Sequence, residues 1–295
     1  MFEASLLHRR PTLDFSIGIP GWQGGIAELA TRDPIDRAPV WIRLKTWAER
    51  WMDTQTWRQS IGGLWLEFDN STFEPSLFFL WPPPGSDNGQ ALPVLLGGAI
   101  QLLGKVTDAG HVRKHVPPGS TVTHVGGALG RPETGIRLCQ HPAGSIEEFL
   151  KTVSWSGTLA GAGADIAGML DFADGAVAVI TVADAVGERL GLELYCRGED
   201  AARRQDVMIA ELTERGWCEP GFVDAIRKWR GGIDESDPWP KNLAARRARL
   251  GPRAQCTLNS ALSHIKLSVA GNRREDAKTY IWMGPVWRFS RPATS

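Results

Sequence analysis

Short segments in which apolar and polar residues alternate recur along the chain, and two of them near the C-terminus each carry a lysine. These segments, residues 263–269 and 278–283, place Lys266 and Lys278 in the middle of their polar side. A period of two predicts β-strands, because successive side chains of a strand point to opposite faces. Two neighbouring strands would thus present lysines on one face, which either meets bulk solvent or lines a wet cavity.

Similar alternation predicts further strands, and helical periodicity predicts the segments between them. The predicted strands cover residues 12–19, 63–69, 76–81, 120–129, 135–140, 176–183 and 189–196. The predicted helices cover residues 39–59, 92–105, 145–153, 160–173, 199–216 and 219–231. We expect loops at the proline-rich residues 82–91 and around "HVRKH". From residue 145 onward, pairs of helices alternate with pairs of strands, and the first half follows a rougher version of that order.

The predicted strands share one apolar side, which the helices would cover, and one polar side that is partly aromatic. In addition to the two lysines, the polar side carries Glu67, Arg137 and Tyr195. An open antiparallel sheet can expose such a side to water. However, eight or nine twisted strands tend to curl and close, and bulky rings beside single charges suit a lined cavity. We therefore predict an α+β fold, an antiparallel β-barrel of repeated ααββ units with helices outside and a polar, aromatic lumen.

Composition narrows the range of partners. The chain has 295 residues, a size that single barrels reach, so we expect one domain over residues 1–295. Lys and Arg total 33, as do Asp and Glu, and this balance gives no sign of a nucleic-acid partner. No window approaches the ~20 apolar residues of a membrane span, and the N-terminus lacks the apolar run of a signal peptide. Four scattered cysteines without a CxxC pair fit reduced thiols, so we expect a soluble, cytoplasmic protein.

Antiparallel strand pairs, outer helices and a polar lumen with a Lys-x-Tyr strand, here Lys278 and Tyr280, resemble the αββα-barrel (ABBA) prenyltransferases. The length is similar to that of the shorter aromatic and cyanobactin-type peptide prenyltransferases. In that family an allylic diphosphate ionises inside the barrel, and an electron-rich acceptor attacks the carbocation. The resemblance implies transfer of an isoprenyl group from an allylic diphosphate to an aromatic small molecule or a peptide side chain. It implies Mg²⁺ only as an ion that accompanies the diphosphate.

The resemblance also implies roles for residues on the polar side. Preorganised cations stabilise a departing diphosphate, and hydrogen-bond donors add to them. The residues that would bind the diphosphate are Arg137, Lys266, Lys278 and Tyr280. Aromatic rings shield and stabilise a carbocation, and Tyr195 and Trp282 would supply them. Glu67 resembles the carboxylate that holds or deprotonates the acceptor, and Asp69 shares its face.

Two other functions are compatible with the same sequence. A non-catalytic protein can use an α+β sheet to bind a peptide or small ligand, since a fold does not fix a function. A barrel enzyme that works without diphosphate, such as a cyclase, is the third reading. Cations gathered in one region of a lumen would favour transfer chemistry, whereas lysines dispersed over an outer surface would favour the binding protein. The absence of an Asp-rich DDxxD run disfavours an all-helical isoprenoid synthase.

Overall fold

The computed structural model describes residues 1–6, 13–31, 38–69, 74–104, 108–131, 135–233 and 254–289. Its strands are β1 Phe2–Ser5, β2 Leu13–Pro20, β3 Gly63–Phe68, β4 Pro75–Trp81, β5 Thr121–Ala128, β6 Ile136–His141, β7 Gly175–Val182, β8 Val186–Tyr195, β9 Gly231–Ile233, β10 Ala254–Ala270 and β11 Arg273–Phe289. Its α-helices are α1 Gly25–Thr31, α2 Pro39–Asp53, α3 Gln55–Ser60, α4 Asn88–Leu103, α5 Ala109–Arg113, α6 Ile146–Thr152, α7 Ala162–Met169, α8 Ala201–Glu214 and α9 Pro220–Lys228. Two 3₁₀ turns, η1 Gly21–Gln23 and η2 Leu170–Phe172, complete the described elements.

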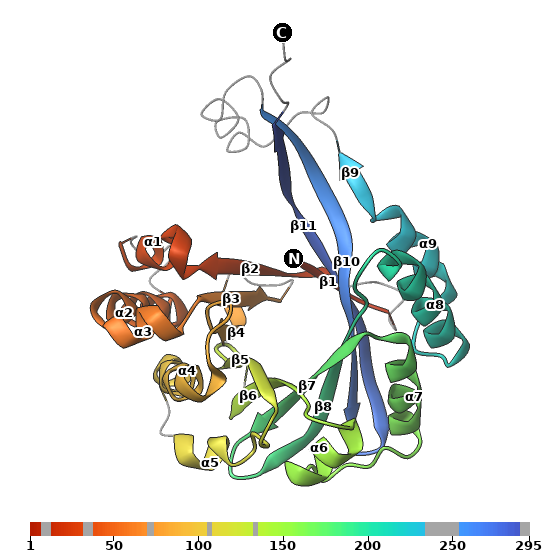
Figure 1. Ribbon diagram of the computed structural model, residues 1–295, viewed down its shortest axis with the longest axis horizontal. Helices are drawn as coiled ribbons and strands as arrows, with labels where there is room; N and C mark the ends of the chain where they lie inside the picture. Colours follow the sequence, from red (N-terminus) through yellow and green to blue (C-terminus); the bar gives the residue numbers. More distant parts are fainter. Residues whose placement is uncertain are drawn as a thin grey trace.

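The strands close into one antiparallel barrel. Hydrogen bonding runs from β11 to β1, then in chain order to β8, then to β10, which pairs with β11 again. The short β9 pairs with β10 beside the barrel. The helices lie on the outside of the strands in chain order (Figure 1). The predicted α+β barrel with outer helices is therefore confirmed.

The main hydrophobic core lies between the barrel wall and the helices. Leu64 and Leu66 of β3 belong to the same buried cluster as Trp47 of α2 and Leu95 and Leu96 of α4. Because strand side chains alternate, burying one face of each strand against helices leaves the other face to line the lumen. The polar side of the sequence pattern is thus the inside of the barrel.

The first strand of the barrel was not predicted. β1 is four residues long, too short for alternation to stand out, yet it pairs with β2 on one side and with β11 on the other. It supplies the partner that the strand predicted at 12–19 lacked. The barrel consequently has five strand pairs around its wall.

The C-terminal hairpin is longer than predicted. β10 and β11 are 17 residues each, whereas the alternation covered only residues 263–269 and 278–283. The mixed residues 254–262 show no clear alternation, and Gly284 and Pro285 interrupt the pattern of the other strand, so the outer half of the hairpin was not predicted. Beyond the other strands, the hairpin extends alone apart from β9 (Figure 1). Its turn contains Gly271, whose φ of 60° is easy for glycine.

Helix boundaries differ from the sequence prediction at side-chain caps. α4 begins at Asn88, inside the predicted loop 82–91, where the Asp87 carboxylate accepts a 2.8 Å hydrogen bond from the Gly89 N–H. Likewise, α5 occupies part of the predicted "HVRKH" loop and begins after Asp108, which caps Gly110. Such caps satisfy amides that a first turn leaves unpaired. The predicted helix 39–59 divides at Thr54 into α2 and α3, and α1 was not predicted.

Several smaller predictions concern charge, thiols and membranes. Two basic stretches of the sequence, residues 227–232 and 244–253, fit solvated helix faces better than a nucleic-acid surface. In the first, Arg227 and Arg230 contact Asp206. The second lies outside the described residues. All four cysteines are buried. Among the described helices, none combines the length and hydropathy that crossing a bilayer requires.

Candidate active site in the barrel lumen

Two adjoining cavities of the lumen bring the predicted site residues together. The first, called here the cationic cavity, is lined by Glu67, Arg137, Lys266, Lys278 and Tyr280. The second, the aromatic cavity, has a volume of about 230 Å³ and is lined by Glu67, Tyr280, Tyr195 and Trp282. Glu67 and Tyr280 line both. Seven residues predicted from five separate segments therefore share one lumen, although their roles stay predictions.

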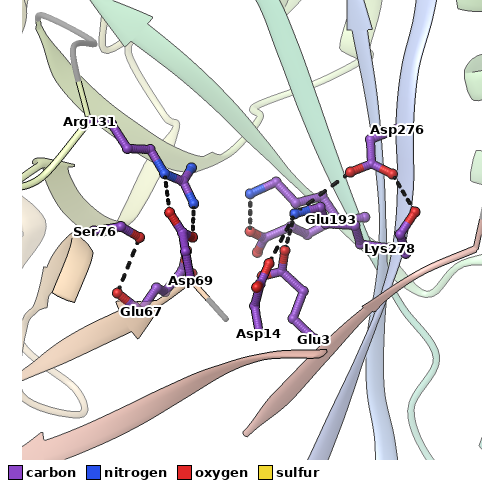
Figure 2. Close-up of polar contacts among 11 residues, drawn as sticks. Glu3, Asp14, Glu67, Asp69, Ser76, Arg131, Glu193, Asp276 and Lys278 are labelled. Carbon is purple, nitrogen blue, oxygen red and sulfur yellow. Dashed lines mark hydrogen bonds and ion pairs between the residues drawn. The ribbon is translucent and has the colours of Figure 1, made fainter. Parts of the chain in front are cut away.

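The two lysines face each other across the C-terminal hairpin. Lys266 of β10 lies directly opposite Lys278 of β11 in the strand register. Lys266 Nζ is 3.3 Å from Glu193 Oε1 on β8, and both side chains are mostly buried. Lys278 Nζ forms an ion pair with Glu3 of β1 and lies 3.6 Å from Asp276 Oδ2 (Figure 2). Each lysine is held inward by a carboxylate, so neither lies on an outer face.

These ion pairs fix the charge state of the cationic cavity. Burial favours the neutral form of Glu193, but the Lys266 ammonium and other neighbouring groups, among them the Tyr195 hydroxyl, together lower the Glu193 pKa to about 2. Burial likewise opposes ionisation of Glu3, yet Lys278 and a hydrogen bond from Tyr280 hold the Glu3 pKa below its usual value. In return, Glu3 raises the pKa of Lys278 in spite of burial. The partners are therefore charged at neutral pH.

The charged residues of the cationic cavity that were missed from the sequence are Glu3, Arg131 and Arg189. Glu3 is 7% exposed and hydrogen-bonds both Lys278 and Tyr280, and it was missed together with strand β1. Arg131 follows β5 in a turn and binds the Asp69 carboxylate with two nitrogens (Figure 2). Arg131 carried no strand signal, whereas the polar alternation of Asp14 and Ser16 would have pointed to inward-facing residues of β2, near Lys278 and in the aromatic cavity. The cavity between these charges measures about 40 Å³.

A stack of three rings lines the aromatic cavity. The His264 ring lies 4.2 Å from the Tyr280 ring at an interplanar angle of 15°, and 4.8 Å from the Tyr195 ring. Burial lowers the His264 pKa to about 4, so the imidazole is neutral at physiological pH. His264 Nδ1 is 3.1 Å from Ser263 Oγ, while the buried Nε2 has no hydrogen-bond partner among the described residues. His264 shared the polar side of its predicted strand, but sequence reasoning gave it no role.

Glu67 lies where the two cavities meet. Burial, and then the negative charge of Glu3, raise the pKa of Glu67 to about 7, although Lys266 and Arg137 act in the opposite direction. We expected this carboxyl group at the acceptor end, apart from the cations. Instead it borders both zones, so it can exchange a proton near neutral pH within reach of either.

The described part of the chain contains no group of three or more His, Cys, Asp or Glu side chains arranged to hold a metal ion. The anionic groups near Lys278 are engaged with that ammonium instead.

Comparison with known proteins identifies the fold. The chain is similar to the solved structure of a 6-dimethylallyl tryptophan synthase, with a TM-score of 0.53 and 13% identity, over 96% of this chain and 80% of that one. A 5-dimethylallyltryptophan synthase from Streptomyces coelicolor gives a TM-score of 0.49 and 13% identity, over 94% and 79%. No family model matches the sequence, and no curated protein matches it. The barrel is thus of the ABBA prenyltransferase type, while the subgroup stays a prediction.

Proposed function

We propose that the protein transfers an isoprenyl group from an allylic diphosphate to an aromatic acceptor, which is a small molecule or a peptide side chain. The main observation that supports this proposal is that one lumen divides into a cationic and an aromatic cavity, which share Glu67 and Tyr280. A polyanionic leaving group needs preorganised cations, and an allylic carbocation is favoured beside ring faces. The name of the structural neighbour, a dimethylallyl tryptophan synthase, supports the same donor and acceptor types.

In this proposal the lumen residues divide the reaction between them. Lys266, Lys278, Arg137 and Tyr280 bind the diphosphate, whose C–O bond breaks with the electron pair leaving on oxygen. A carbon of the acceptor ring then forms a bond to the allylic carbon. Glu67 takes the proton that this ring carbon loses, which restores aromaticity. Rings of Tyr195 and Trp282 shield the carbocation from water, which would otherwise trap it as an alcohol.

Donor binding requires a rearrangement of charges. The cationic cavity of about 40 Å³ holds only a few water molecules, because the carboxylates of Glu3, Asp14 and Asp276 surround Lys278. A diphosphate carries more charge than one carboxylate and can compete for the Lys278 ammonium. We therefore infer that the donor displaces at least one carboxylate from Lys278 on binding.

The same ion pairs favour a second candidate, a non-catalytic protein that binds a peptide or small ligand. Lys266 and Lys278 already have carboxylate partners, as structural ion pairs do. The deciding experiment incubates the protein with allylic diphosphates of several chain lengths and a set of aromatic acceptors. Prenyl transfer requires released pyrophosphate together with an acceptor heavier by one isoprenyl unit. Ligand-dependent thermal stabilisation without pyrophosphate release would support the binding protein instead.

The pH dependence of transfer is expected to follow Glu67. The group must be ionised to accept a proton, and its pKa in the folded protein is about 7. We expect kcat/KM to rise as pH increases through about 7 and then to level off, since kcat/KM reports the free enzyme. The measurement is a pH–rate profile with both substrates limiting. A profile that stays flat from pH 5.5 to 8.5 would remove Glu67 from the role of base.

His264→Phe is expected to lower kcat/KM for the acceptor by roughly 2–10-fold. Phenylalanine keeps a ring between Tyr195 and Tyr280 but removes Nε2, the buried nitrogen with no partner among the described residues. A neutral hydrogen bond contributes about 0.5–1.5 kcal/mol, which gives this range. The control is His141→Phe, because His141 lies on β6 and bonds the Ala176 carbonyl outside both cavities. Equal effects of the two variants would assign His264 to packing alone.

A further inference from the structure

A third cavity opens where β2 and β4 end and where β3 and β5 begin. It measures about 640 Å³, and it shares Trp65 and His124 with the aromatic cavity. We call it the tryptophan vestibule and define it by Trp22, Trp65, Trp81 and the prolines 82, 83 and 84. Nothing in the proposed chemistry uses it. Its position makes it the outward continuation of the space in which the acceptor ring would react.

The vestibule wall is built to present flat aromatic surface. Trp65 lies across from Gly18, and Trp81 across from Gly63, in the register of neighbouring strands. A Cβ on Gly18 would stand 2.9 Å from the Trp65 ring, so the glycine is what lets the indole lie against the wall. The Trp65 and Trp81 rings are 5.5 Å apart. Such rings offer large contact area at a small loss of side-chain entropy.

The vestibule also lacks formal charge. Among the described residues that line it there is no Asp, Glu, Lys or Arg. Burial lowers the pKa of His124, which keeps this imidazole neutral at physiological pH. The Thr123 hydroxyl is already engaged, since it donates to the Cys139 carbonyl at 3.2 Å. By contrast, the cationic cavity brings several charged groups together. Charged groups of an acceptor would therefore find no counter-charge on the vestibule side.

Trp22 stands at the rim with its ring uncovered. The residue lies in η1, directly after β2, and 62% of its surface is exposed. A large exposed indole beside an apolar concavity is typical of a contact that a partner covers. A small aromatic acceptor that fills the inner cavity would leave this ring, and most of the 640 Å³, unused.

From these observations we propose that the acceptor is an aromatic side chain within a peptide, and that the tryptophan vestibule binds the uncharged residues that flank it. This inference rests on the proposed function, because that function places the reacting ring in the aromatic cavity. A free amino acid is disfavoured as acceptor, since its ammonium and carboxylate would enter a region without counter-charges. Peptide bonds replace both charges by neutral amides, and apolar flanking side chains contact the indoles and prolines.

Calorimetric titration without any donor tests the proposal. The probes are free tryptophan, Nα-acetyl-tryptophan amide, an N-acetylated and C-amidated pentapeptide with central tryptophan and alanine flanks, and the same capped peptide with aspartate flanks. We expect the alanine-flanked pentapeptide to bind at least roughly tenfold more tightly than each of the others, because it alone fills the vestibule without charge. Equal or tighter binding of free tryptophan, or of the single capped residue, would overturn the proposal.

Trp22→Ala provides the matched variant. It should weaken binding of the alanine-flanked pentapeptide by roughly fivefold to tenfold, a common effect of truncating an aromatic contact. Binding of the capped single residue should be unchanged. The control is Trp229→Ala, which removes another exposed tryptophan, 40% exposed and placed after α9, far from the vestibule in the fold. Indistinguishable effects of the two variants would contradict the proposal. Pyrophosphate release is measured separately with donor present, so a failure of transfer with peptide binding intact would refute the catalysis and not the vestibule.

Discussion

Glu67→Gln is expected to lower the turnover of prenyl transfer by roughly 10²-fold, the lower end of the loss that follows removal of a general base. The amide keeps the shape and hydrogen-bonding capacity of the side chain but cannot take the proton from the acceptor ring. Diphosphate affinity should stay near that of the unmodified protein or rise slightly, because Glu67 contributes negative charge beside Lys266 and Arg137. Steady-state turnover and calorimetric titration with the donor measure the two quantities.

A stability measurement separates this effect from misfolding. The Glu67 pKa rises from 4.5 in the unfolded chain to about 7 in the folded protein, so the folded state holds the extra proton between those values. The free energy of unfolding should therefore fall as pH rises from about 4.5 to 7, and the Gln variant should lose that slope. Glu188→Gln is the control, since Glu188 is an exposed carboxylate of β8 that lines neither cavity. Unchanged turnover in Glu67→Gln, or equal loss of turnover and donor affinity, would count against the assigned role.

Lys278→Ala is expected to weaken allylic diphosphate binding by at least roughly 30-fold, the equivalent of about 2 kcal/mol for truncation of a buried charge pair. The structure adds a second consequence, for stability. Lys278 neutralises Glu3, whose buried carboxylate would be left unpaired. The variant should therefore also lose about 3 kcal/mol of stability.

A double variant distinguishes binding from folding. Glu3→Gln combined with Lys278→Met removes both members of the ion pair, so we expect most of the lost stability to return. Diphosphate affinity should remain low, because the ammonium is still missing. Lys228→Ala, at an exposed position of α9, controls for a general loss of positive charge. Recovery of donor affinity in the double variant would show that Lys278 supports the fold and does not contact the donor.

The sequence predicted the strands of the barrel wall more completely than the arrangement of side chains in the lumen. Alternation in β3, β6, β8, β10 and β11 identified which residues face inward, because a strand that is buried against helices on one side has no other pattern available. Strand β1 was not predicted, because four residues are too few to show a period of two, and Glu3 was therefore missed as well. Arg131 was missed because it reaches the lumen from a turn, where no periodicity applies.

The pairing of charges was also beyond sequence reasoning. Lys266 and Glu193 are 73 positions apart, and only the register between β8 and β10 brings them together. The Glu193 pKa of about 2 shows that this carboxylate is the permanent counter-charge of Lys266. Likewise, the position of Glu67 between the two cavities depends on the three-dimensional curvature of the wall and not on its place in β3.

Closure of the barrel between its first and last strands has a consequence for how the protein folds. Strand β1 is hydrogen-bonded to β11, and Glu3 is separated from Lys278 by 275 positions in the chain. Contacts of such long range are slow to form, because closing the loop lowers the chain entropy before the favourable energy of the contact is gained. During synthesis β1 leaves the ribosome before β11 and cannot pair with it until β11 has been made. We therefore expect a long-lived intermediate with an open sheet edge, in which the hairpins are formed and the donor site is not, and a strong dependence of the yield of active protein on chaperones.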